Sequence, residues 1–78
     1  MEIVWNTAKE SPYLGDLSDI TKAQWALVTH VRVGYTDDTF EWVPFKGLDA
    51  RGYMIDTART SRGATTVCPE DVWGLRFR

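Results

Sequence analysis

The stretch that decides the fold is residues 26–45, ALVTHVRVGYTDDTFEWVPF. Its first half places Leu27, Val31 and Val33 among polar residues with a period close to two. This alternation is typical of a strand that buries one face. Residues 36–38 are Thr-Asp-Asp, and aspartate both tolerates turn geometry and bonds its own backbone. The stretch therefore predicts an antiparallel hairpin whose first strand buries the face that carries the leucine and the two valines.

Short strand and turn signals fill most of the remaining chain. Pro44 lacks a backbone N–H and therefore predicts a sheet edge or a bulge near the end of the hairpin. On the closing strand we expect Trp73, Leu75 and Phe77 to share one buried side. The other expected elements are a strand at 3–5, a loop at 46–49, strands at 53–60, 64–68 and 73–77, and a helical turn at 69–72 that a proline opens.

Residues 17–25 are the one helix candidate. Thr21 and Gln24 have the spacing of a capping box, and Ile20, Ala23 and Leu27 have the spacing of one helical face. The strand pattern begins directly afterwards, so we expect one or two turns only. The predicted fold class is mainly β, a small antiparallel barrel or twisted sheet of five to six strands with one short helix in a single domain, 1–78.

Composition excludes several functional classes. The formal net charge of the 78 residues is −2, which is typical neither of a nucleic-acid binder nor of an acidic nucleic-acid mimic. Acids exceed bases up to Glu41, and bases exceed acids from Trp42 onward. Such an asymmetry indicates either two faces of opposite potential or charges that interleave on folding. No apolar run approaches the roughly 18 residues of a membrane span, so we expect a soluble cytoplasmic protein.

Residues for catalysis are scarce. His30 is the single histidine and Cys68 the single cysteine, which leaves no histidine pair and no thiolate pair to hold a metal ion. The acid pairs at 37–38 and 70–71 lie in expected turns, where carboxylates already have a structural reason to be. We therefore predict no catalytic residues, no metal site and no cofactor, and a protein that is not an enzyme.

Binding residues are present in two groups. The first is the tip of the first hairpin, where Asp37, Asp38 and Glu41 lie beside Trp42, a residue type that dominates binding hot spots. We predict that this group contacts a protein partner. The second group is the arginines of the following hairpin, which suit phosphate recognition and leave a small nucleic-acid-binding barrel as the alternative. Its members are Arg51, Arg59 and Arg62.

Two resemblances follow from these features. The order of strand, helical turn at 69–72 and final strand resembles the end of an SH3-like barrel, without the residues that bind proline-rich peptides. The length, the mild acidity and the lack of common motifs resemble those of small phage proteins, among them anti-CRISPR inhibitors. That likeness implies a stoichiometric inhibitor that covers a surface of a host-defence nucleoprotein complex.

Overall fold

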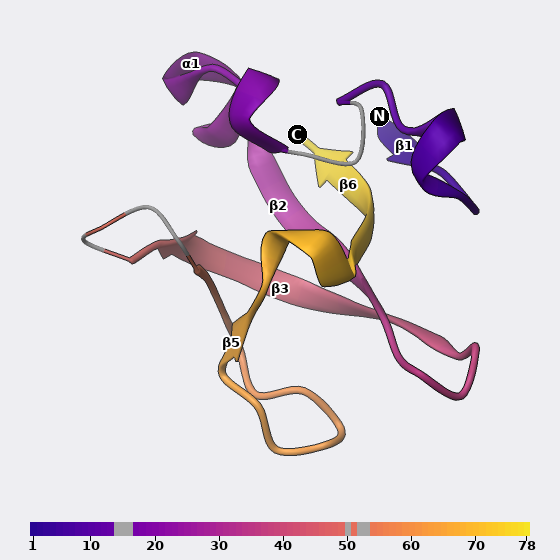
Figure 1. Ribbon diagram of the computed structural model, residues 1–78. Helices are drawn as coiled ribbons and strands as arrows, with labels where there is room; N and C mark the ends of the chain where they lie inside the picture. The colour runs from indigo at the N-terminus through magenta and orange to yellow at the C-terminus, as the bar shows by residue number, and fades with distance from the viewer. Residues whose placement is uncertain (14–16, 50, 52–53) are drawn as a thin grey trace.

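A single antiparallel sheet organises the described residues of the computed structural model (Figure 1). The structure describes residues 1–13, 17–49, 51 and 54–78. Within them the sheet has six strands in the order β1-β6-β2-β3-β4-β5, and no ladder joins β5 back to β1. The expected mainly β fold is confirmed, in the form of an open, twisted sheet. The strands are β1 (Glu2–Val4), β2 (Val28–Gly34), β3 (Phe40–Leu48), β4 (Ile55–Thr57), β5 (Thr66–Val67) and β6 (Val72–Phe77).

Helical structure in the described residues is short. It comprises the 3-10 helices η1 (Ala8–Glu10), η2 (Leu17–Asp19) and η3 (Pro69–Asp71) and the single α-helix α1 (Lys22–Trp25). The predicted capping box is present, because the Thr21 hydroxyl accepts from the Gln24 amide and the Gln24 side chain accepts from the Thr21 amide. The helical turn after Cys68 is also confirmed.

The predicted first hairpin forms from β2 and β3. Its turn places Asp38 in the left-handed region at φ 63°, and the Tyr35 amide donates to the Thr39 carbonyl. The expected loop at 46–49 is wrong for residues 46–48, because β3 continues through them. β3 pairs with β2 up to Pro44 and with β4 from Phe45 onward, and the pairing with β4 has a register shift between Phe45 and Gly47. The strand predicted at 53–60 is shorter, and Tyr53 lies outside the described residues.

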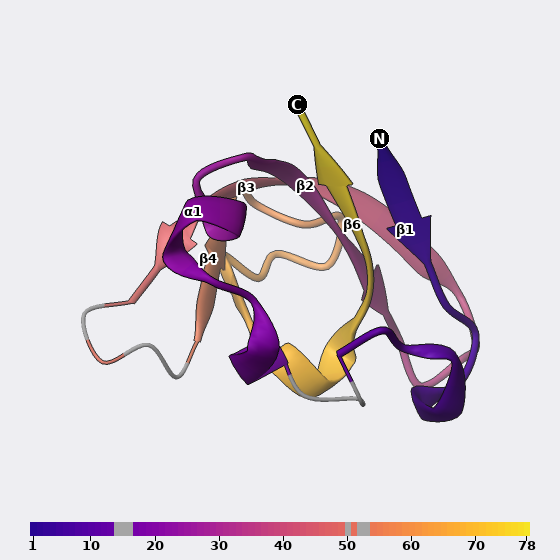
Figure 2. The same cartoon turned by 90° about the horizontal axis from the view of Figure 1, so that it is seen from above.

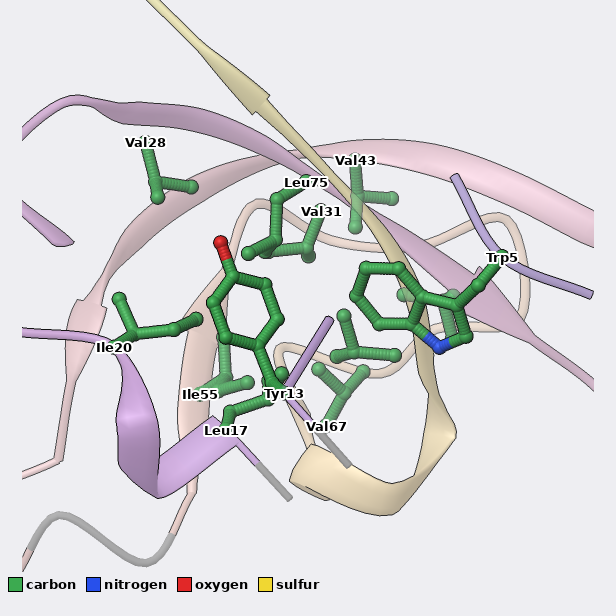
Figure 3. Close-up of a cluster of buried hydrophobic side chains, with 12 residues drawn as sticks. Trp5, Tyr13, Leu17, Ile20, Val28, Val31, Val43, Ile55, Val67 and Leu75 are labelled. Atoms are coloured by element: carbon green, nitrogen blue, oxygen red, sulfur yellow. The ribbon is translucent and has the colours of Figure 1, made fainter. Parts of the chain in front are cut away.

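The sheet curves over a core that its concave side encloses (Figures 2 and 3). Trp5 and Tyr13 meet edge to face with ring centroids 6.1 Å apart, which closes this core beneath the sheet. The buried apolar residues are Trp5, Tyr13, Leu17, Ile20, Val28, Val31, Val33, Val43, Ile55, Val67, Val72 and Leu75.

Leu27 was predicted to lie on the buried face of the helix and of the first hairpin strand. Both predictions are wrong, because Leu27 is 49% exposed. The helix ends at Trp25, so Leu27 lies in the turn before β2 and belongs to neither pattern. Ile20 is buried as expected, whereas Ala23 is exposed. Trp25 is half-buried and stacks on Phe45 at 5.3 Å.

Trp73 differs from its predicted position. A register shift separates the pairs Arg32–Gly74 and Val33–Val72, so Trp73 is the extra residue of a bulge. It is half-buried, and a Cβ atom added to Gly34 would meet its indole. Because Val33 points into the core, its neighbour Gly34 faces the other side of the sheet, and the Trp73 ring lies there too. Leu75 is fully buried in the core, whereas Trp73 is half-buried and packs against the core cluster.

Candidate binding surface

The convex side of the sheet carries a group of arginine and aromatic side chains. Val31, Val43 and Leu75 point into the core, so the residues next to them along each strand point outward. No helix of the described chain lies over this side in Figure 2. We name it the outer face and define it by Arg32, Phe40, Trp42 and Arg76.

Guanidinium groups stack on rings across the outer face. The Arg32 Cζ atom lies 3.8 Å from the centroid of Phe40, and the Arg76 Cζ atom lies 4.5 Å from that of Trp42. Arg76 Nε also donates to the Glu2 carboxylate at 3.0 Å. Each cation–π contact is worth about 0.5–1 kcal/mol at an exposed site, so the stacks hold these side chains in one arrangement.

Gly74 gives Trp42 room to lie on the sheet. A Cβ atom there would stand 3.2 Å from the Trp42 Cη2 atom and 3.1 Å from the Arg32 Cβ atom. The Arg32 guanidinium group also lies close against the protein surface, because its Nη1 atom is buried.

The acids at the hairpin tip are largely used within the chain. Arg62 Nη2 donates to Asp37 at 2.6 Å, and its Cζ atom lies 4.1 Å from the centroid of Tyr35. Glu41 accepts from the Tyr35 hydroxyl at 2.6 Å and from the Ser61 amide and hydroxyl at 2.9 and 2.8 Å. We call these five residues the clasp, because they tie the loop at 58–65 to the first hairpin.

Hydrogen bonds in the clasp shift several pKa values. Donation from the Thr39 hydroxyl and then from Arg62 lowers the pKa of Asp37 to about 2. Donation from Tyr35 and then from Ser61 lowers the pKa of Glu41, while burial and the bond to Glu41 raise the pKa of Tyr35. Both carboxylates are therefore ionised and engaged at neutral pH.

A hollow of about 300 Å³ lies at one end of the outer face. Tyr35, Phe40 and Trp73 supply its aromatic lining, and Asp38, Glu70 and Asp71 supply its charge. Within the described chain these three carboxylates make no hydrogen bond or ion pair, in contrast to those of the clasp. The remaining lining residues are Asn6, Gly34 and Thr36.

The predicted binding residues are only partly brought together. Asp38 lines the hollow, and Trp42 is half-buried on the outer face with the Arg76 guanidinium over its ring, whereas Asp37 and Glu41 belong to the clasp. In the alternative group, Arg59 and Arg62 share the loop at 58–65, with Arg59 exposed and Arg62 paired to Asp37. Arg51 is exposed and lies after the end of β3, outside that loop.

Neither predicted binding group contained Arg32, Phe40 or Arg76. The alternation in β2 already placed Arg32 opposite the core. The alternation does not show which strand pairs with β2. That strand is β6, which begins only at Val72 and places Arg76 opposite His30, beside the hairpin.

The two residues weighed for catalysis lie in ordinary contacts. His30 Nδ1 is 3.0 Å from the Thr29 hydroxyl, and Cys68 Sγ is 3.8 Å from Met54 Sδ. Among the residues that the structure describes, no three histidine, cysteine or acidic side chains gather as a metal site would require. None of the described helices has the length and apolar character to cross a membrane.

Comparisons of the chain with protein families, with curated proteins and with solved structures find no match.

Proposed function

We propose that this chain is a non-enzymatic binding protein that acts by covering a surface of a partner protein, one copy for each site. The observation that carries the proposal is the outer face, where Phe40 is 41% exposed and two arginines are already held over rings. Tryptophan, tyrosine and arginine dominate the binding energy of protein interfaces. Side chains that are ordered before binding lose less conformational entropy on association.

The partner we propose is a host-defence nucleoprotein complex of bacteria, with the chain as a phage inhibitor of the anti-CRISPR type. Two features of the surface support this class. The unpaired acids of the hollow suit a protein groove that holds phosphate with lysine and arginine. The outer face beside them supplies the apolar and aromatic area that such a contact also needs.

A phage-plating assay tests this function. Bacteria with an active CRISPR system would express the parent chain, Trp42→Ala, or Lys9→Ala as a control on exposed η1. We expect the parent and Lys9→Ala to restore plaques, and Trp42→Ala to restore at least about tenfold fewer, the effect of 1.4 kcal/mol of lost binding. Full activity of a folded Trp42→Ala variant would refute the assignment to the outer face.

Purified components test the stoichiometric mechanism. When the chain is titrated into the complex that it inhibits, the activity of the complex should stop falling at one chain for each binding site. Inhibition that continues to grow with time at far lower ratios would indicate turnover and would refute the non-enzymatic mechanism.

Nucleic acid is the second candidate partner. The outer face suits nucleic acid better than the predicted group of Arg51, Arg59 and Arg62 does. Arg32 and Arg76 beside Phe40 and Trp42 combine positive charge with rings on which bases stack. Binding of this kind weakens with salt by a logarithmic slope of about −0.7 to −0.9 for each phosphate contacted. Gel-shift titrations with single- and double-stranded probes at several salt concentrations would show that slope, and its presence at micromolar affinity would place nucleic acid first.

A further inference from the structure

We infer that the hollow binds an arginine side chain of the partner. This inference rests on the proposed function and adds to it the chemical group that the hollow recognises. The hollow combines the ring of Trp73 with the carboxylates of Asp38, Glu70 and Asp71 in a space of about 300 Å³. Tryptophan is the aromatic ring that attracts cations most strongly.

The clasp contains the same combination with its arginine in place. There Arg62 lies 4.1 Å from the centroid of Tyr35 and donates to Asp37 at 2.6 Å. Ring and carboxylate together thus hold a guanidinium group elsewhere in this molecule. No arginine of the described chain lies over Trp73, so the hollow offers the ring and the carboxylates without the cation.

Arginine fits this arrangement better than lysine. A guanidinium group is planar, stacks on an aromatic face and presents donors that match a carboxylate at two points. An ammonium group is compact and more strongly hydrated, so it loses more on leaving water. The hollow is lined by both aromatic and acidic residues, and a planar guanidinium group can contact both.

A nuclear magnetic resonance titration tests the inference without any partner protein. The probes are N-acetyl-arginine methylamide, the corresponding lysine derivative and the corresponding citrulline derivative, which keeps the shape of arginine without its charge. We expect the arginine probe to shift the indole N–H signal of Trp73 and the amide of Gly34, with weaker binding of the lysine probe. Equal shifts with citrulline, or lysine binding as tightly as arginine, would overturn the inference.

Variants of the hollow locate the binding. Glu70→Gln and Asp38→Asn should each weaken the arginine probe roughly two- to fivefold, as the loss of one partly exposed ion pair does. Asparagine also accepts a positive φ, so Asp38→Asn keeps the turn. Asp19→Asn, which removes an exposed acid on η2, is the control for net charge and should leave the affinity unchanged. Unchanged affinity in both hollow variants would overturn the inference.

This test separates the hollow from the proposed function. If the arginine probe does not bind while Trp42→Ala still restores at least about tenfold fewer plaques, only the hollow assignment fails. If the probe binds as expected while folded Trp42→Ala inhibits fully, only the outer-face function fails.

Discussion

Replacing Gly34 with alanine tests the packing at the junction of the outer face and the hollow. An added Cβ atom would stand 2.4 Å from Cδ1 and 2.7 Å from Nε1 of Trp73, and 3.2 Å from Cε1 of Phe40. Ordinary contacts begin near 3.4 Å, so the indole must move by about 1 Å. Forcing an extra carbon into a packed site typically costs about 1–3 kcal/mol.

The expected loss of stability is opposite to the intrinsic preference of a strand for alanine over glycine. Glycine within a strand is usually worse than alanine by roughly 0.5–1 kcal/mol, so a strand without the clash would gain stability from Gly34→Ala. Here we expect the free energy of unfolding to fall and the Tm to drop by roughly 5–20 °C, since 1 kcal/mol corresponds to about 4–8 °C in a domain of this size. Thermal and urea unfolding followed by circular dichroism would measure both.

A double-mutant cycle with Trp73→Leu identifies the cause. The smaller side chain removes the indole, so Gly34→Ala should cost less in the Trp73→Leu background than in the parent. A Gly34→Ala variant within about 0.5 kcal/mol of the parent would refute the packing described here. An equal cost in both backgrounds would show that the indole is not the obstacle.

Three further perturbations address the core, the clasp and the helix. Leu75→Ala should cost about 2–5 kcal/mol because Leu75 is 0% exposed, whereas Leu27→Ala should stay within about 0.5 kcal/mol; urea titration compares them. Because the pKa of Asp37 is lowered to about 2, its contribution is complete above its ordinary pKa near 4 and is lost as pH falls toward 2. The protection of the Ser61 amide against hydrogen exchange should fall over that interval relative to the protection of a core amide. Equal changes in protection at both amides would contradict the clasp. Thr21→Ala should cost about 0.5–2 kcal/mol through loss of the capping box, and an unchanged unfolding midpoint would contradict that role.

The elements set by local rules could be predicted from the sequence. Alternation in β2 identified Val31 and Val33 as core, and the spacing of Thr21 and Gln24 identified the start of α1. Proline opened η3 where expected, because its fixed φ suits the first helical position. These features depend on residues within a few positions of one another.

Features that depend on distant partners could not be predicted. The bulge at Trp73 lies in the pairing of β6 with β2, and a single extra residue changes the side that a strand residue faces. The pairing of Asp37 with Arg62 joins two loops that were assigned to different candidate sites. Period-two patterns state which residues alternate, but not which strands lie together.

The position of β6 between β1 and β2 also constrains how the chain folds. β1 reaches its partner across more than seventy residues, with Glu2 opposite Arg76. Sheets dominated by such distant pairings fold slowly, because the entropy of closing a long loop is lost before the contacts form. Until Val72–Phe77 has left the ribosome, β1 has no neighbour in the sheet and β2 has only β3. We therefore expect the native sheet to form only after β6 has been synthesised, in one cooperative step.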